Sequence, residues 1–342
     1  MTARIERLRP RLEEPLLVTN PVNVLYLTGF ESSNAALLVE PERARLYTDF
    51  RYIEAARAVE GVEPVQTKRS LIGWLADELD GRIGFEADVL PWSLAERLRS
   101  GGIDLVPRSG LVEQLRRVKD ESELASFRRA CAITDRMFER LVEEVPFVGR
   151  RERDVAWDIT RLYHEEGAAE QAFETIVGSG PTGARPHARA GDRVIGEGEL
   201  VVIDTGCRAG GYASDYTRTL ATGQLDDEQH EAYEVVLAAQ RAGLEAIRAG
   251  VSGIEADAAA RDVVEGSDFA GTFGHGLGLD VHEAPRLSTE SPDTLEIGNV
   301  VTVEPGVYLE GRFGIRIEDD VVVTADGVEN PVRFTKELVT VA

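Results

Sequence analysis

Hydrophobic and polar residues alternate in two different ways along the chain, which predicts two regions. In residues 1–115, short apolar runs alternate with turn residues, as in a layered α/β domain. The predicted strands of this region are Leu16–Val18, Val24–Leu27, Ala36–Val39, Arg45–Tyr47 and Arg82–Phe85. The predicted helices are Asp49–Val59 and Ser70–Leu79. We therefore expect a small α/β domain over residues 1–115.

The second region, residues 116–342, has longer periodic segments. Asp120 and Glu123 have the spacing of a capping box, and an amphipathic pattern continues to about Glu144. The further predicted helices are Arg151–Glu166, Asp227–Arg248 and Ile254–Val264. The predicted strands are Glu174–Val177, Leu200–Asp204, Tyr212–Leu220, Val300–Glu304, Val307–Leu309, Gly314–Glu318 and Val321–Val323. The order helix, helix, strands thus occurs twice. Although residue identity between the halves is weak, the order predicts an α+β domain of two pseudo-symmetric halves around one site.

One predicted strand, Leu200–Asp204, is apolar until its last residue, which is typical of a strand buried on both faces. A two-residue turn at Ala209-Gly210 would bring Asp204 directly opposite Asp215 on the return strand. Cβ atoms of such a pair are about 4.5–5.5 Å apart. Carboxylates this close repel each other unless one is protonated or a cation lies between them.

A second hairpin repeats this arrangement. Val300–Glu304 also ends in a carboxylate, and a turn centred on Gly311 would place Glu304 opposite Glu318. Four carboxylates together with one imidazole form a plausible set of ligands for two divalent ions about 3.5–4 Å apart. Ligation rich in carboxylates favours Mn²⁺, Co²⁺ or Fe²⁺ over a structural zinc site built from thiolates.

Each acid also has an ordinary interpretation when it is taken alone. Asp204 could belong to a strand-end turn, and Asp215 could simply form an ion pair with Arg218. Glu304 could belong to a turn, and Glu318 could be part of a solvated acidic run. The joint arrangement of four acids at two similar hairpins favours the metal site.

The chain has five histidines, and their surroundings separate them into two groups. His164 and His230 lie within polar helical stretches, so we expect them on the surface. His187, His275 and His282 lie in turns rich in glycine or proline, where backbone can approach a ligand closely. These three are therefore the candidate functional histidines.

Composition and charge exclude several classes of protein. No apolar run reaches the roughly 18 residues of a membrane span, and no secretory signal opens the chain. The two cysteines have no partner motif, which is typical of a reducing cytoplasm. A formal charge of −23 disfavours binding to nucleic acid or anionic membrane. Because the surface is acidic and lysine occurs only at positions 68, 119 and 336, we also expect a halophilic source, with an ordinary acidic bacterial enzyme as the alternative.

Several motifs, in this order along the chain, resemble those of the pita-bread metallopeptidases of family M24, and most closely prolidase and Xaa-Pro aminopeptidase. The catalytic motifs are Pro186-His187, Val202–Gly206, Gly211–Thr219, Gly274–Glu283, Val303–Gly306 and Ile315–Asp319. Asn23–Phe30 and Tyr47–Tyr52 resemble the amino-terminal domain of creatinase and prolidase, and Leu115–Asp120 resembles its linker. The resemblance covers nearly the whole chain. It implies a pita-bread catalytic domain, a creatinase-like amino-terminal domain and a homodimer.

The resemblance also implies a role for each metal ligand. Asp204 would bind one of two divalent ions, Mn²⁺ or Co²⁺ ahead of Zn²⁺ or Fe²⁺. Asp215 and Glu318 would bridge both ions, and His275 and Glu304 would complete the second. A bridging hydroxide would attack the Xaa-Pro bond, and Glu304 would move its proton to the leaving nitrogen.

His187 and His282 would contact the substrate and stabilise the oxyanion. One position departs from the family pattern. Many relatives have a further histidine four residues before the ligand histidine, where this chain has Gly271. Part of the set of substrate contacts is therefore uncertain, although every metal ligand is present.

Other candidate activities are distinguished by their residues. Creatinase does not keep the metal ligands, methionine aminopeptidase usually lacks a domain like residues 1–115, and an aspartic protease would need a second Asp-Thr-Gly loop. A different metal-dependent reaction on the same fold stays an alternative, as does a binding protein without activity. A non-catalytic relative would be expected to have lost ligands.

The last open choice is between a dipeptidase and an Xaa-Pro aminopeptidase that acts on longer peptides. A dipeptidase must recognise a free carboxylate beside the scissile bond, and guanidinium binds carboxylate bidentately. Arg286 lies four residues after His282, in a tract that resembles the prolidase loop in which an arginine meets that carboxylate. We therefore expect a prolidase, with Arg286 binding the substrate. The alternative is an ion pair between Arg286 and Glu283 or another acid.

Overall fold

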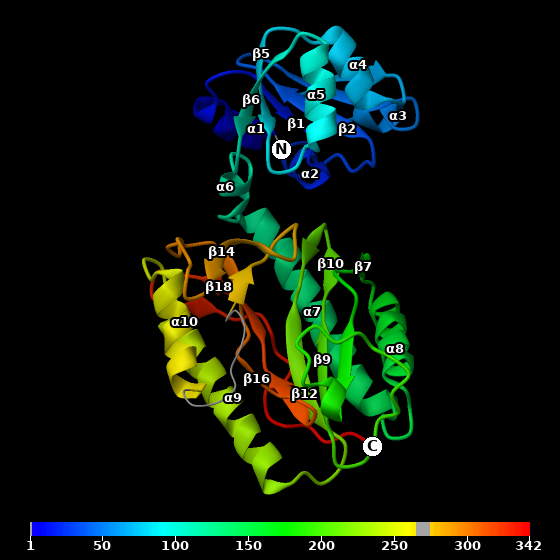
Figure 1. Ribbon diagram of the computed structural model, residues 1–342, viewed down its shortest axis with the longest axis vertical. Helices are drawn as coiled ribbons and strands as arrows, with labels where there is room; N and C mark the ends of the chain where they lie inside the picture. The colour runs from blue at the N-terminus through cyan, green and yellow to red at the C-terminus, as the bar shows by residue number, and fades with distance from the viewer. Residues whose placement is uncertain (1, 265–273) are drawn as a thin grey trace. The chain divides into compact units, whose positions relative to one another are not determined.

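The computed structural model describes residues 2–264 and 274–342, which form two compact units, Met1–Arg116 and Arg117–Ala342. The smaller unit contains one six-stranded sheet in the order β4-β3-β2-β1-β5-β6 (Figure 1). Its strands are β1 (Leu16–Val18), β2 (Ala35–Val39), β3 (Ala44–Asp49), β4 (Glu63–Thr67), β5 (Arg82–Glu86) and β6 (Asp104–Arg108). Its helices are α1 (Thr2–Leu8), α2 (Pro21–Thr28), α3 (Ile53–Ala56), α4 (Leu71–Glu78), α5 (Trp92–Ser100) and α6 (Glu113–Arg116), with a 3-10 turn at Arg9–Arg11.

Helices α4 and α5 share a hydrophobic core with the sheet. Leu75 and Leu98 from these helices are fully buried in one cluster with Leu17 and Leu38 from the sheet. The mixed sheet, with its parallel β1-β5-β6 and antiparallel β1-β2-β3 pairings, is the expected layered α/β arrangement.

Two predictions for this unit are wrong. Val24–Leu27 is not a strand but lies within α2, because Pro21 occupies the first helical turn and the Asn20 side chain accepts a hydrogen bond from the backbone of Val22. The expected helix Asp49–Val59 is reduced to α3, since β3 continues to Asp49. Five elements, α1, β4, α5, β6 and α6, have no counterpart among the predicted ones.

The larger unit has two halves, each with two helices followed by strands. The first half contains α7 (Glu121–Glu144), α8 (Glu152–Glu165), β7 (Glu170–Gln171), β8 (Ile176–Ser179), β9 (Leu200–Thr205), β10 (Cys207–Ala209), β11 (Tyr212–Ala213) and β12 (Tyr216–Ala221), with a 3-10 turn at Gly180–Thr182. The second contains α9 (Asp227–Ala246), α10 (Gly253–Arg261), β13 (Gly274–Gly276), β14 (Glu283–Leu287), β15 (Val300–Val303), β16 (Gly306–Leu309), β17 (Phe313–Arg316), β18 (Asp319–Val323) and β19 (Val328–Glu329), with a 3-10 turn at Asp262–Val264. The predicted α+β class and its repeated order are confirmed.

Each half has its own core, and the strands between the helix pairs supply it. In the first half α7 and α8 pack on the sheet β12-β9-β8, and in the second α9 and α10 pack on the strands β15 and β18 and their neighbours (Figure 1). The capping box at Asp120 and Glu123 is formed as predicted. Strands β13 and β14 have no counterpart among the predicted elements, because His275 and His282 were interpreted as lying in turns rich in glycine or proline. No helix within the described ranges is both long and apolar enough to cross a lipid bilayer.

Candidate metal centre

The first acid pair lies on one hairpin, but in a different register from the predicted one. The turn is Gly210-Gly211, where both residues have positive φ (58° and 86°), rather than Ala209-Gly210. These angles suit a two-residue turn that only glycine adopts at little cost. Asp204 therefore pairs with Thr217, not with Asp215. Because the shift is two residues, both acids still point to the same face of the hairpin.

Asp215 lies between β11 and β12, where the strand is interrupted. Its backbone N–H donates to the Asp320 carboxylate at 2.7 Å. Gly206 lies on the other strand, and a Cβ there would be 1.8 Å from the carbonyl oxygen of Ser214. The close backbone approach beside Asp215 thus requires glycine at position 206.

The second hairpin has the predicted register. Strand β16 pairs with β17, and β15 pairs with β18, in one continuous alignment around a turn at Gly311, whose φ is 73°. This alignment places Glu304 opposite Glu318. Glu318 is only 2% exposed, so it is not part of a solvated acidic run.

His275 on β13 joins the two hairpins. Its Nε2 atom is 3.7 Å from Asp215 Oδ2 and 3.4 Å from Glu304 Oε1. One potential ligand atom from each of Asp215, His275 and Glu318 lies within 4.8 Å of the others. Four of the five predicted ligands therefore converge from strands that are up to about a hundred residues apart in sequence.

Asp204, the fifth predicted ligand, is held by Arg316. The Arg316 Nη2 group donates to Asp204 Oδ2, and Arg316 also donates to the Tyr308 hydroxyl at 2.7 Å. The other oxygen, Asp204 Oδ1, is buried and has no hydrogen-bond partner among the described residues. A buried carboxylate oxygen without a partner is costly, and a cation would satisfy it.

Two threonine hydroxyls orient two of the carboxylates. Thr217 accepts a hydrogen bond from Arg316 Nε at 2.9 Å, so its own proton is donated to Glu318 Oε2, at 2.7 Å. Thr302 likewise accepts from the backbone N–H of His275 at 3.1 Å and donates to Glu304 Oε1 at 3.2 Å. Sequence reasoning missed Arg316 and both threonines, although each is two residues from a predicted ligand and so shares its face of the strand.

Burial and mutual repulsion act together on these acids. Burial raises the pKa of Asp215 well above its usual range, and the neighbouring Asp204 raises it further. The pKa of Glu318 is also raised, first by burial and next by the neighbouring Asp215. Burial raises the pKa of Glu304 to about 7. Without a cation, some of these groups would hold protons at neutral pH.

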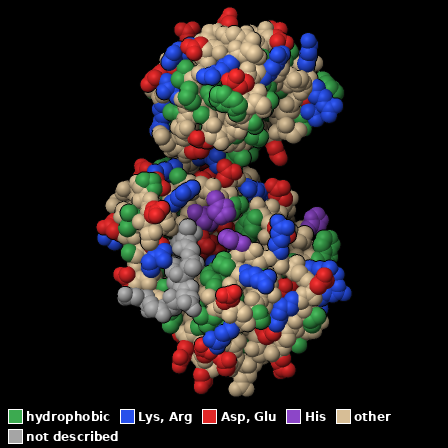
Figure 2. Space-filling model, viewed as in Figure 1, with side chains coloured by type: hydrophobic (Ala, Val, Ile, Leu, Met, Phe, Trp, Pro, Cys, Tyr) green, Lys and Arg blue, Asp and Glu red, His purple; other side chains and the backbone are tan. Residues whose placement is uncertain are grey.

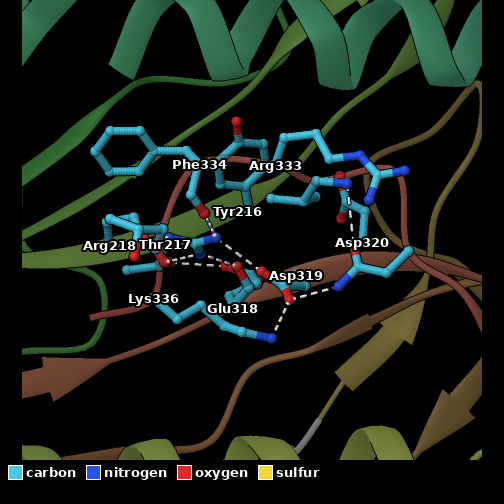
Figure 3. A network of polar contacts seen from close by, with 12 residues as sticks. Tyr216, Thr217, Arg218, Glu318, Asp319, Asp320, Arg333, Phe334 and Lys336 are labelled. Carbon is cyan, nitrogen blue, oxygen red and sulfur yellow. Dashed lines mark hydrogen bonds and ion pairs between the residues drawn. The ribbon is translucent and has the colours of Figure 1, made fainter. Parts of the chain in front are cut away.

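A network behind the site fixes the strands that carry the ligands (Figure 3). The buried Arg218 guanidinium pairs with Asp319 at 2.9 Å and not, as the simplest reading of the sequence suggested, with Asp215. It also donates to the carbonyl oxygens of Glu318 at 2.6 Å and Phe334 at 2.8 Å. Arg218 thereby holds the backbone of a predicted ligand and a segment near residue 334 together.

The three candidate histidines lie near one another. The ring centroids of His275 and His282 are 4.2 Å apart, and the pKa of His282 is lowered first by burial, next by His275 and to a small extent by His187. Histidine and acidic side chains are visible together on one face of the larger unit (Figure 2). Gly271, where many relatives have histidine, lies outside the described residues.

Arg286 lies on β14 directly opposite His275 on β13. Its side chain is exposed, and among residues 2–264 and 274–342 no acid forms an ion pair with it. Glu283, the partner that the alternative reading proposed, binds Lys119 instead at 2.7 Å. Facing residues of an antiparallel pair have Cβ atoms about 4.5–5.5 Å apart, so the guanidinium is within reach of the site.

The donor set fits divalent cations, and we expect their binding to strengthen as pH rises. Protons compete for the buried carboxylates, whose raised pKa values favour protonation, and Glu304 releases its proton only near pH 7. The increase in Tm on adding MnCl₂ to chelator-treated protein should therefore be small at pH 5.5 and larger at pH 8. A stabilisation that is equal at both pH values would contradict this coupling.

Comparisons with known proteins identify the family of this chain. The family model described as metallopeptidase family M24 matches residues 125–325, and that of the creatinase/prolidase N-terminal domain matches residues 4–118. An Xaa-Pro dipeptidase of Pyrococcus furiosus is 33% identical over 99% of this chain and 100% of its own length. The structure of an Xaa-Pro dipeptidase from Bacillus anthracis has a TM-score of 0.95 and 37% identity, with 99% of each chain covered. That of an X-Pro aminopeptidase from Thermotoga maritima has a TM-score of 0.90 and 34% identity, covering 99% of this chain and 100% of that one. The expected family is thus confirmed, and this chain belongs to metallopeptidase family M24, with a creatinase/prolidase N-terminal domain before its catalytic part.

Proposed function

We propose that this protein is a prolidase, which hydrolyses the Xaa-Pro bond of dipeptides with two divalent ions. The observation that carries the proposal is the convergence of four of the five predicted ligands beside the Asp204 carboxylate, whose Oδ1 atom is buried without a hydrogen-bond partner among the described residues. Asp204 would bind one ion, and His275 and Glu304 would bind the other. Asp215 and Glu318 would bind both ions. Ligation dominated by carboxylates favours Mn²⁺ or Co²⁺. When bound, such ions supply a hydroxide nucleophile at neutral pH and polarise the scissile carbonyl.

The protein residues position the substrate and move the proton. We assign proton transfer to the leaving nitrogen to Glu304, because its carboxylate lies beside His275 among the predicted ligands, where it can exchange a proton with the reacting groups. His187 and His282 would bind the substrate and stabilise the developing oxyanion. The position of His282 beside His275, with His187 close enough to lower the pKa of His282, supports this assignment.

Arg286 gives the dipeptidase proposal its main support. Arg286 is exposed, pairs with His275 in the register of β13 and β14, and has no acidic partner among the described residues. In a dipeptide the free carboxylate is adjacent to the scissile bond, so a cation near the metal ligands can bind it. An internal proline has no carboxylate at this position.

Replacing Arg286 by leucine should therefore reduce kcat/KM for an Xaa-Pro dipeptide by about 10- to 150-fold, equivalent to about 1.5–3 kcal/mol for a charged hydrogen bond. Hydrolysis of an Xaa-Pro-Xaa tripeptide should change little. Both substrates are measured with Mn²⁺ and with Co²⁺. Arg241→Leu, which removes another exposed arginine, is the control.

The alternative is an Xaa-Pro aminopeptidase, which the similarity to the Thermotoga maritima enzyme supports. If the unmodified protein cleaves the tripeptide much faster than the dipeptide, the aminopeptidase assignment is correct. If neither peptide is cleaved with any of these metals, a different metal-dependent reaction on this fold becomes the better assignment.

We also propose a cytoplasmic homodimer that is most stable in concentrated salt. Both cysteines are buried and free, which suits a reducing compartment. A charge of −23 repels itself, and salt screens that repulsion. We expect Tm to rise when KCl is increased from about 0.1 M to about 1 M. Over this range the Debye length falls from about 10 to 3 Å, so repulsion between the surface charges is screened. An unchanged Tm would contradict the halophilic assignment, and a monomeric mass by light scattering would contradict the dimer.

A further inference from the structure

A buried ion pair lies beside the loop that carries His282 and Arg286. Lys119 Nζ donates to Glu283 Oε1 at 2.7 Å, and the two side chains are only 1% and 8% exposed. Bringing two charges out of water costs about as much as their attraction returns, so such a pair adds little net stability. The pair does fix geometry, because breaking it would leave one charge buried without its partner.

The same short segment contacts the loop a second time. Arg117 Nη1 donates to Asp293 Oδ1 at 2.9 Å, and the other oxygen of Asp293 accepts the backbone N–H of Arg286 at 2.8 Å. One carboxylate thus connects Arg117 to the backbone of Arg286. The segment is itself anchored, since the Lys119 N–H donates to the carbonyl oxygen of Gly298 at 2.9 Å.

The two contacts hold the loop at both ends. Glu283 directly follows His282. Arg286 pairs with His275 in the register of β13 and β14, and Leu287 pairs with Gly274. The Glu283 carboxylate also lies against the β13 side of the loop, since a Cβ at Gly278 would be 2.4 Å from Glu283 Oε1. His282 is therefore placed between anchored points, next to the His275 ring.

We propose that Arg117 and Lys119 are positioning residues that set how far His282 and Arg286 lie from the metal ligands. The inference rests on the proposed function, because it takes His282 and Arg286 as substrate contacts. Displacing a substrate contact by about 1 Å can cost on the order of 10²-fold in rate. Neither Arg117 nor Lys119 needs to touch the substrate for this effect.

The test uses the single variants Lys119→Met and Glu283→Gln and the double variant that contains both. Each single variant removes one charge of the buried pair and leaves the other uncompensated within it, so Tm and kcat/KM for the Xaa-Pro dipeptide should both fall. The double variant removes both charges, and its Tm should return close to that of the unmodified protein. If the pair positions the loop, kcat/KM of the double variant should nevertheless stay about tenfold or more below that of the unmodified protein. Most of this loss should come from a higher KM. Full recovery of both quantities would overturn the proposal.

The matched control is Arg128→Met with Glu329→Gln, which removes an ion pair of similar length, 2.7 Å, elsewhere in the same unit. This double variant should leave kcat/KM unchanged. Arg117→Met should raise KM for the dipeptide in the same direction as the Lys119 variant. An unchanged KM would remove Arg117 from the proposal.

A second readout does not depend on activity, and so separates this inference from the proposed function. The chain has five histidines, and selective ¹⁵N labelling of histidine resolves their ring signals in the metal-free protein. In the double variant the His282 signal, assigned by its loss in His282→Gln, should shift while those of His164 and His230 do not. An unshifted His282 signal would show that the pair does not position the ring. If the signal shifts but the unmodified protein hydrolyses no Xaa-Pro peptide, the positioning role holds and the proposed function fails.

Discussion

Glu318→Ala should lower hydrolysis of Xaa-Pro peptides by on the order of 10³-fold or more and leave fewer than two metal ions per chain. Glu318 is buried within reach of Asp215 and His275. Because Glu318 is proposed to hold the metal ions, its loss would weaken the site that supplies the nucleophile and the charge that stabilises the transition state. Asp215→Ala should have the same effect for the same reason.

Metal content is measured by mass spectrometry after dialysis against MnCl₂, together with peptide hydrolysis. Glu329→Ala is the control, because Glu329 pairs with Arg128 on the surface and not with the candidate centre. The unmodified protein should lose activity in excess chelator and regain it when Mn²⁺ or Co²⁺ is restored. Full activity in chelator would refute the metal-dependent assignment.

Glu304→Gln should lower kcat by about 10²–10⁴-fold, the usual contribution of a general acid–base group, while KM changes only a few-fold. The amide oxygen can still approach a metal ion, whereas the amide cannot carry a proton between the nucleophile and the leaving nitrogen. Substrate binding should therefore be largely retained, whereas the chemical step should become much slower. Steady-state kinetics with metal added in excess separates the two quantities.

Glu310→Gln on the same hairpin is the matched control, since the Glu310 side chain is exposed. It should change neither kcat nor KM. A large rise in KM with unchanged kcat in the Glu304 variant would instead give Glu304 a role in binding alone.

Local sequence signals predicted the parts of the fold that local interactions determine. The helix after Asp120 was predictable because its capping box and amphipathic pattern are both close in sequence. The strand prediction for Val24–Leu27 is wrong because four apolar residues fit a strand or a helix, and the cap at Asn20 decides between them. Similarly, Ala209-Gly210-Gly211 offers two possible turns, and only the φ angles of the actual turn select one.

The acids of the candidate centre were predictable because each ends an apolar strand or begins its return. The residues that orient them were not. Arg316 contacts Asp204, which is 112 positions away, and Lys119 contacts Glu283 across 164 positions. Pairings over such separations depend on how whole strands pack against each other, and alternation within one strand carries no information about them.

The contacts of Arg218 have a consequence for how the protein matures on the ribosome. Arg218 is buried against the carbonyl oxygens of Phe334 and Thr335, and Lys336 pairs with Asp319 beside Glu318. Chains emerge from their amino-terminal end at about 5–20 residues per second. All five predicted metal ligands are therefore synthesised before the segment that locks their strands. A nascent chain stalled after residue 325 would expose these side chains on an unfinished scaffold, and metal capture would be completed only after residues 334–336 leave the exit tunnel.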